Sequence, residues 1–219
     1  MHTSTPEPGD SLTYQDVIDP LRTAYDGMVA ERASHETQSW KVDERWRFLA
    51  ELRREQRTSL LEVGAGTGVH GKFFQDQGLQ VVCTDLSPEM VGHCRAKGLE
   101  AYVADFLSLD FADRRFDAAF AMNCLLHVPY PDLGSALAAI AATLVPGGLF
   151  YLGQYGGIER TGVWRHDTYE PKRYFSYLTD DQLQKATRQY FAIVDFRRVP
   201  VEGEADGYFQ ALTLRRPEA

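Results

Sequence analysis

The sequence has few cysteines and no long apolar run. Its 219 residues contain three cysteines, Cys83, Cys94 and Cys124, and none of them belongs to a Cys-x-x-Cys pair. This spacing argues against a disulfide-stabilised scaffold and favours reduced thiols. No stretch approaches 18 consecutive apolar residues, and residues 1–10 lack the charged start and apolar run of a signal peptide. We therefore expect a cytoplasmic protein with no membrane partner and a disordered start over residues 1–10.

Positive charge is also scarce. The chain has 23 Lys and Arg against 31 Asp and Glu, which gives a net charge of -8. Nucleic acids are bound through basic patches, so we expect no nucleic-acid partner. The six histidines show no i, i+4 pairing, and no cysteine lies near one of them in a recognised ligand motif. The sequence therefore predicts no metal site.

A glycine-rich turn follows an apolar segment. Residues 60–68 read Leu-Leu-Glu-Val-Gly-Ala-Gly-Thr-Gly, which predicts a buried strand and a turn before a helix over residues 69–77. Because glycine has no Cβ, Gly64, Gly66 and Gly68 allow the backbone to approach a ligand closely. The N-terminal amides of the helix point at the same place. The segment is typical of a site for a nucleotide-like ligand.

Two residues argue against a dinucleotide in this turn. The dinucleotide fingerprint G-x-G-x-x-G needs its third glycine where this chain has Val69. Glu62 places an acid at the end of the strand, where it would repel a phosphate. The turn therefore favours a ligand that carries a cation.

Four further signals follow the glycine-rich turn. They are a second strand that ends in an acid, a third strand with an acid just past its end, a fourth strand that runs into a loop, and a Pro-Gly-Gly turn before a fifth strand. These signals occupy residues 81–85, 101–106, 116–128 and 144–152. A carboxylate at the end of the second strand can reach ribose hydroxyls. Each signal alone is weak, and their common order makes them specific.

In this order, the five signals resemble class I S-adenosylmethionine-dependent methyltransferases. The resemblance implies S-adenosyl-L-methionine as the cofactor and S-adenosyl-L-homocysteine as its product, with no metal. It also implies a Rossmann-like, doubly wound α/β sheet of seven strands in the order 3-2-1-4-5-7-6, with the last strand antiparallel and helices on both faces. The residues implied to bind the cofactor are Tyr25, Glu62, Gly64, Ala65, Gly66, Gly68, Asp85, Leu86, Met90, Asp105, Phe106, Asn123 and Cys124.

We expect a single domain over residues 11–219. Its parts are a helical cap, a cofactor-binding core, a substrate lid, and a C-terminal helix with a hairpin, at residues 11–56, 57–154, 155–178 and 179–219. Residues 155–178, called the lid segment below, lack a long periodic pattern but contain five aromatic residues after Tyr155. Long irregular segments of a compact domain are usually functional or disordered, and the aromatic content argues against disorder.

Three side chains are candidates for catalysis. His127 follows the fourth strand, and Tyr155 and His166 lie in the lid segment. A hydroxyl acceptor needs a base, which His127 can supply, or His166 together with Asp167. Tyr155 offers an aromatic face to a sulfonium. The sequence equally allows His127 to be bonded to the backbone and the pair of His166 and Asp167 to lie at the surface.

The leading hypothesis is methyl transfer to a small-molecule substrate by a monomer or homodimer. The acidic charge and the compact aromatic lid segment favour it. Arg165, Lys172 and Arg173 in the lid segment hint at an acceptor with a carboxylate. The alternatives are a methyltransferase that acts on a protein or RNA, and a protein of the same fold that binds the cofactor without methyl transfer.

Overall fold

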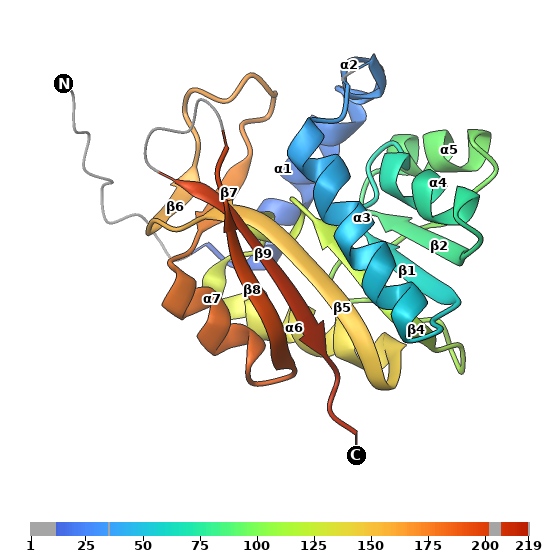
Figure 1. Cartoon of the computed structure of the whole chain (residues 1–219). Helices are drawn as coiled ribbons and strands as arrows, with labels where there is room; N and C mark the ends of the chain where they lie inside the picture. The colour runs from blue at the N-terminus through green and yellow to red at the C-terminus, as the bar shows by residue number, and fades with distance from the viewer. Residues whose placement is uncertain (1–11, 35, 202–206, 219) are drawn as a thin grey trace.

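The computed structural model describes residues 12–34, 36–201 and 207–218 (Figure 1). The predicted disordered start over residues 1–10 lies outside these ranges. The main sheet has seven strands in the order β3-β2-β1-β4-β5-β9-β8. Their bounds are β1 Ser59–Val63, β2 Gln80–Asp85, β3 Glu100–Val103, β4 Phe116–Met122, β5 Leu144–Gly156, β8 Ala192–Val199 and β9 Tyr208–Arg215.

The predicted strand order and fold class are confirmed. The first five strands of the main sheet are parallel to one another, whereas β9 runs antiparallel to both β5 and β8. Because β6 and β7 form a separate sheet, β8 and β9 are the sixth and seventh strands of the main sheet. The carboxyl ends of the parallel strands therefore meet at one edge, where open α/β sheets bind their ligands.

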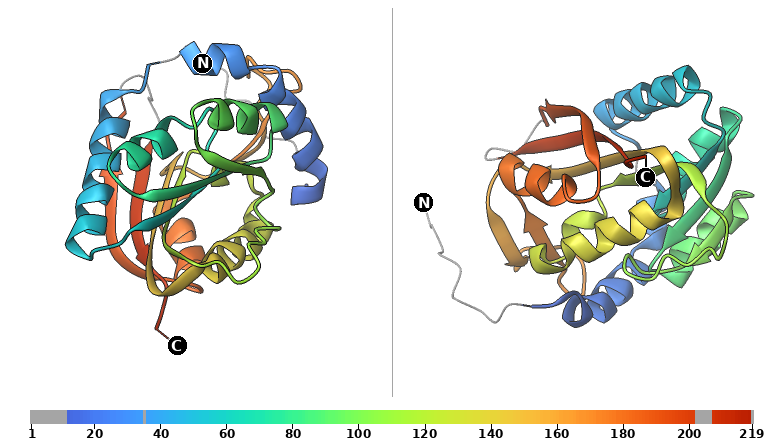
Figure 2. Two further views of the ribbon diagram at one scale, coloured as in Figure 1. Left: turned by 90° about the vertical axis from the view of Figure 1, so that its right-hand side faces the viewer. Right: turned by 90° about the horizontal axis from the view of Figure 1, so that it is seen from below.

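Helices cover both faces of the main sheet. The helices are α1 Tyr14–Asp26, α2 Val29–Ser34, α3 Ser39–Arg54, α4 Val69–Asp76, α5 Pro88–Ala96, α6 Tyr130–Thr143 and α7 Asp180–Thr187, with a 3-10 turn, η1, at Leu125–His127. Residues of α3, α4 and α5 share one apolar cluster, and residues of α1, α6 and α7 share the other. Figure 2 shows α3 and α6 on opposite sides of the sheet.

Local sequence signals fix where two of the helices begin. The Ser87 hydroxyl accepts from the backbone N of Met90 and caps α5, with Pro88 in the first turn. Thr179 and Gln182 form the predicted capping box at the start of α7. These caps set the direction in which each helix leaves the carboxyl edge of the sheet.

The lid segment contains a small antiparallel sheet that the sequence did not predict. Strands β6 (Arg160–Val163) and β7 (Tyr174–Tyr177) pair with each other over their whole length. Each strand has only four residues, which is too short for an alternating pattern to be recognised. The hairpin lies beside α1 and α2 above the carboxyl edge of the main sheet (Figure 1).

Candidate functional site

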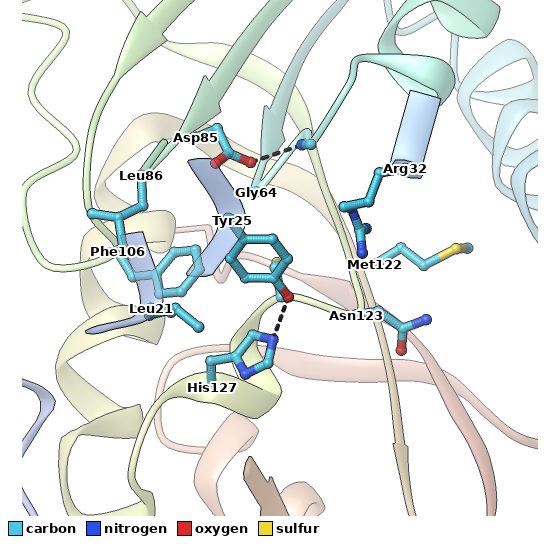
Figure 3. A pocket seen from close by; sticks show the side chains of 12 residues that line it. Leu21, Tyr25, Arg32, Gly64, Asp85, Leu86, Phe106, Met122, Asn123 and His127 are labelled. Atoms are coloured by element: carbon cyan, nitrogen blue, oxygen red, sulfur yellow. Dashed lines mark hydrogen bonds between the residues drawn. The ribbon is translucent and has the colours of Figure 1, made fainter. Parts of the chain in front are cut away.

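A pocket of about 50 Å³ lies at the carboxyl edge of the main sheet. Three groups of residues line it, from α1 and α2, from the ends of β1 and β2, and from the segments after β3 and β4. They are Leu21, Tyr25, Arg32, Gly64, Gly66, Asp85, Leu86, Phe106, Met122, Asn123, Cys124 and His127. Nine of these twelve were predicted from the sequence. Figure 3 shows the Tyr25 ring in the middle of the pocket, with its hydroxyl pointing to His127.

The glycine turn has the backbone conformation that its sequence predicts. Gly64, Gly66 and Gly68 have φ angles of 68°, 55° and 77°, in a region that side chains with a Cβ rarely adopt. A Cβ on Gly64 would lie 2.4 Å from the Cβ of Cys124, whereas among the described residues a Cβ on Gly66 would meet only Arg32, at 3.9 Å. The turn is therefore packed from below at Gly64 and open toward the pocket at Gly66.

Asp85 holds the glycine turn through the backbone. One oxygen of its carboxylate accepts from the N–H of Gly66 over 2.7 Å, and the other accepts from the N–H of Ser87 over 3.0 Å. Burial raises the pKa of Asp85, and the two backbone hydrogen bonds oppose that rise. The carboxylate thus joins the ends of β1 and β2 while it lines the pocket.

Leu86 and Phe106 follow β2 and β3 and were both predicted to bind the cofactor. Both side chains line the pocket, and Phe106 also contacts the Tyr14 ring of α1 at 5.9 Å between centroids. Met90 is fully buried in α5, and Asp105 accepts from the backbone N–H of Leu107. Neither Met90 nor Asp105 is among the residues that line the pocket.

The end of β4 supplies two residues with unusual constraints. Asn123 has a φ of 57°, and its buried Oδ1 has no hydrogen-bond partner among the described residues. The Cys124 thiol donates to the carbonyl oxygen of Val63 over 3.1 Å. Cys124 therefore ties β4 to β1, and Asn123 leaves one acceptor oxygen free to receive a donor.

Three more predicted cofactor residues, Glu62 before the glycine turn and Ala65 and Gly68 within it, do not line the pocket. Glu62 is buried in β1 with its carboxylate 3.4 Å from the Cys83 thiol. Burial raises the pKa of Glu62 to about 8, against the smaller lowering effects of Cys83 and the backbone of Gly71. Ala65 and Gly68 are also buried, and a Cβ on Gly68 would lie 2.8 Å from the side chain of Leu99. These residues support the turn from inside the fold.

Tyr25 and His127 form a hydrogen bond across the pocket. The Tyr25 hydroxyl lies 2.6 Å from Nε2 of His127, and Nδ1 of His127 lies 2.8 Å from the carbonyl oxygen of Tyr174. Burial lowers the pKa of His127 to about 3. The imidazole is therefore neutral, and it contacts the backbone as the sequence allowed. It also lines the pocket, and its role as a base stays a prediction.

A buried ion pair in the lid segment contacts Tyr25, which lines the pocket. Arg173 bonds both carboxylate oxygens of Asp167 at 2.8 Å and donates to the Tyr25 hydroxyl over 3.2 Å. Its guanidinium also lies 3.5 Å from the centre of the Tyr169 ring. Burial opposes ionisation of Asp167, but its bonds with Arg173 outweigh this and lower the pKa of Asp167. Arg32 of α2 donates to the Tyr169 hydroxyl over 3.2 Å.

The remaining two candidates for catalysis lie outside the pocket. Tyr155 packs against Trp40 and Phe209. His166 is exposed, and its neighbour Asp167 is buried with Arg173. The expected pairing of His166 with Asp167 is not present, because the Arg173 guanidinium satisfies the carboxylate.

Three pocket residues were not predicted. Leu21 lies one helical turn before Tyr25, so helical spacing could have indicated it. Met122 directly precedes Asn123 at the end of β4. Arg32 has no signal in the sequence, because its position depends on how α2 folds back over Gly66.

Comparisons with known proteins agree with the fold and with the glycine turn. Residues 60–148 match the family described as methyltransferase domain. A solved structure of 1,6-didemethyltoxoflavin-N1-methyltransferase from Burkholderia thailandensis, with bound 1,6-didemethyltoxoflavin and S-adenosylhomocysteine, covers 97% of this chain and 94% of its own at 23% identity, with a TM-score of 0.74. The family match thus covers the first four parallel strands of the main sheet and the start of β5, and the solved structure shares the fold of nearly the whole chain.

Two curated relatives match this domain in part. The malonyl-[acyl-carrier protein] O-methyltransferase of Pseudescherichia vulneris is 35% identical over 103 residues, which are 46% of this chain and 40% of that protein. The ubiquinone biosynthesis O-methyltransferase of Xanthomonas oryzae pv. oryzae (strain PXO99A) is 36% identical over 100 residues, which are 42% of this chain and 41% of that protein. The matched region thus spans about two fifths of these relatives.

Membrane and metal features were also sought within the described ranges. None of the helices there combines the length and apolar character needed to cross a bilayer. In the same ranges, no three His, Cys, Asp or Glu side chains are grouped as metal ligands.

Proposed function

We propose that this protein transfers the methyl group of S-adenosyl-L-methionine to a small-molecule acceptor. The observation that carries the proposal is the pocket itself, in which the open glycine turn, the Asp85 carboxylate and the Phe106 ring meet at the carboxyl edge of the sheet. The family match over residues 60–148 supports the same cofactor. The cofactor supplies a methyl group on a positively charged sulfur, which a nucleophile can attack in line.

The residues around the pocket fit this cofactor. Asp85 can accept from ribose hydroxyls, and Gly66 leaves its backbone open to a ligand. The unpartnered Oδ1 of Asn123 can accept from an ammonium group. Arg32, whose guanidinium lies beside Gly66, has the charge to bind a carboxylate. An acceptor for the ammonium group and a cationic donor for the carboxylate of an amino-acid tail are therefore available.

The enclosure of the pocket favours a small acceptor. Tyr25 and Arg32 on one side and Tyr169 and Arg173 on the other are joined over the pocket by hydrogen bonds. A small molecule can be enclosed in this way, whereas a folded macromolecule would need an open surface. The alternative is an acceptor attached to a protein, because one relative is a malonyl-[acyl-carrier protein] O-methyltransferase.

The proposal is tested by label transfer. We would incubate the purified chain with methyl-labelled S-adenosyl-L-methionine and fractionated extract of its source, and follow the label into small-molecule, protein and RNA pools. Label in the small-molecule pool supports the proposal. Label only in macromolecules would favour the alternative acceptor. Failure to bind S-adenosyl-L-homocysteine in calorimetry would overturn the cofactor assignment.

Asp85→Asn tests the cofactor site directly. The variant replaces one acceptor oxygen with an NH₂ group, which cannot accept from Gly66, Ser87 or a ribose hydroxyl. Hydrogen bonds to a charged group contribute about 1.5–3 kcal/mol, so the Kd for S-adenosyl-L-homocysteine should rise about 10- to 100-fold in calorimetry. Asp43→Asn, at an exposed position of α3, is the matched control and should leave the Kd unchanged.

A further inference from the structure

The oxygen atom of the Tyr25 hydroxyl lies between a hydrogen-bond donor, Arg173, and a hydrogen-bond acceptor, His127. Arg173 Nη1 donates to the Tyr25 hydroxyl, which lies 2.6 Å from Nε2 of His127. Nδ1 of His127 lies 2.8 Å from the carbonyl oxygen of Tyr174. Because a carbonyl oxygen only accepts, Nδ1 carries the proton of the neutral ring, and Nε2 presents a lone pair. The Tyr25 hydroxyl thus accepts from Arg173 and donates to His127.

The two bounding groups have fixed positions, and before the transfer Arg173 is charged and His127 is neutral. Asp167 holds the Arg173 guanidinium through both carboxylate oxygens, and the Tyr169 ring stacks on it. The bond to Tyr174 holds the His127 ring, which burial keeps neutral with a pKa of about 3. Arg173 and His127 should therefore keep their positions when the Tyr25 side chain between them is replaced by a ligand or by another residue.

This pair of groups is complementary to a neutral hydroxyl. A carboxylate oxygen would face the lone pair of His127, and an ammonium group would face the positive charge of Arg173. An ether oxygen could accept from Arg173 but would leave Nε2 of His127 without a donor. A buried polar group without a partner costs about 1–3 kcal/mol, which gives the position its selectivity.

The ring that carries the hydroxyl also stands where a ligand would bind. The Tyr25 ring lies in the middle of the pocket (Figure 3), and the space beside it is about 50 Å³. Ligand pockets usually have about 300–1,000 Å³, so Tyr25 must move before a ligand can enter. The Tyr169 ring meets the Tyr25 ring edge to face at 5.7 Å between centroids, so the surroundings already suit an aromatic group.

We infer that the oxygen position between Arg173 and His127 is the subsite for the acceptor, which is a phenol, and that Tyr25 occupies it as an internal substitute. The inference rests on the proposed function, since it names the substrate class of the same site. In the transfer, the phenol oxygen forms a bond to the methyl carbon and the carbon–sulfur bond breaks, which leaves a neutral thioether. The hydroxyl proton passes through Nε2 of His127 to solvent.

The experiment measures binding of three small probes of similar ring size, phenol, benzoate and anisole. Binding to the full chain is followed by NMR titration, with and without S-adenosyl-L-homocysteine. We expect phenol to bind at least tenfold more tightly than benzoate or anisole. Equal affinities for the three probes would overturn the inference.

Tyr25→Phe tests whether Tyr25 competes with the acceptor or helps to bind it. The two roles predict opposite changes in the Kd for phenol. The variant keeps the ring but removes the hydroxyl that competes for Arg173 and His127, so the Kd for phenol should fall about tenfold. A rise in the Kd, or no change, would show that Tyr25 does not compete for the subsite. Tyr102→Phe removes an exposed hydroxyl that bonds only Glu100 among the described residues, and it should have no effect.

The nitrogen resonances of the His127 ring provide a second measurement that does not depend on the affinity of a probe. In Tyr25→Phe the Nε2 resonance should shift as it loses its donor, and phenol should restore it, while Nδ1 stays protonated. A probe that binds without restoring Nε2 would place the phenol elsewhere. Because these titrations also run without S-adenosyl-L-homocysteine, failure of the cofactor assignment and failure of the phenol subsite give different results.

Discussion

The cofactor edge of the pocket and its lid side are held together in different ways. At the cofactor edge, side chains bond the backbone of nearby strands, as Asp85 does with Gly66 and Ser87. On the lid side, side chains bond one another across the chain, and the partners Arg173 and Tyr25 are 148 residues apart in sequence. The first arrangement is set by short motifs, whereas the second exists only when the N-terminal helices meet the lid segment.

The largest effect is expected at the cofactor edge, from Gly64→Ala. Gly64 has a positive φ, and its Cβ would lie 2.4 Å from the Cβ of Cys124. Backbone strain of about 1–3 kcal/mol and overpacking of about 1–3 kcal/mol should together lower the free energy of unfolding by about 4 kcal/mol. Chemical denaturation measures this loss.

Gly98→Ala is the matched control for this variant. Gly98 also has a positive φ, of 77°, but a Cβ there would meet no atom of the described residues within 4 Å. The control therefore carries the strain without the overlap and should lose only about 1–2 kcal/mol. Equal losses in the two variants would show that contact with Cys124 does not constrain the glycine turn.

The lid side is tested by Asp167→Asn. Asp167 is buried and bonds Arg173 through both oxygens. Removing one partner of a buried ion pair leaves an uncompensated charge, which costs about 3–5 kcal/mol, and we expect a loss of about 3 kcal/mol because Arg173 keeps its contacts with Tyr25 and Tyr169. Thermal and chemical denaturation report the loss. Asp113→Asn, at an exposed loop position, is the control and should change the free energy of unfolding little. An equal loss in the two variants would show that the ion pair of Asp167 with Arg173 does not stabilise the fold.

The same contrast explains what the sequence could predict. The glycine turn and the strand ends are local signals, so pocket residues such as Gly66 and Asp85 followed from them, whereas the sheet order followed from the family resemblance that these signals carry. Tyr25 and His127 were identified as single residues, because each has a suitable side chain beside a predicted element. That they touch depends on the tertiary fold.

The lid side was not predictable in the same way. Nothing in the residues around Asp167 indicates that it bonds Arg173 rather than His166, since either partner is close in sequence. The four-residue strands β6 and β7 decide the matter, because their pairing fixes the segment that carries Arg173. Arg32 reaches the pocket only because α2 folds back over the glycine turn.

Glu62 offers the smallest of these effects and tests whether the cofactor edge is supported from beneath. Burial raises its pKa to about 8 in the folded protein, above the ordinary value of 4.5. The folded protein therefore binds the proton more tightly than the unfolded chain, and stability should fall as the pH rises from about 4.5 to 8 and level off above that. Between pH 6 and pH 9 the loss should be about 2.7 kcal/mol, since about two pH units lie between pH 6 and the folded pKa of about 8 and each unit corresponds to about 1.4 kcal/mol. Glu62→Gln cannot ionise, so its denaturation midpoint should change less over this range, whereas the exposed control Glu89→Gln should follow the wild type. Parallel pH profiles for Glu62→Gln and the wild type would mean that Glu62 is ionised in the fold, with its charge stabilised by the backbone of α4.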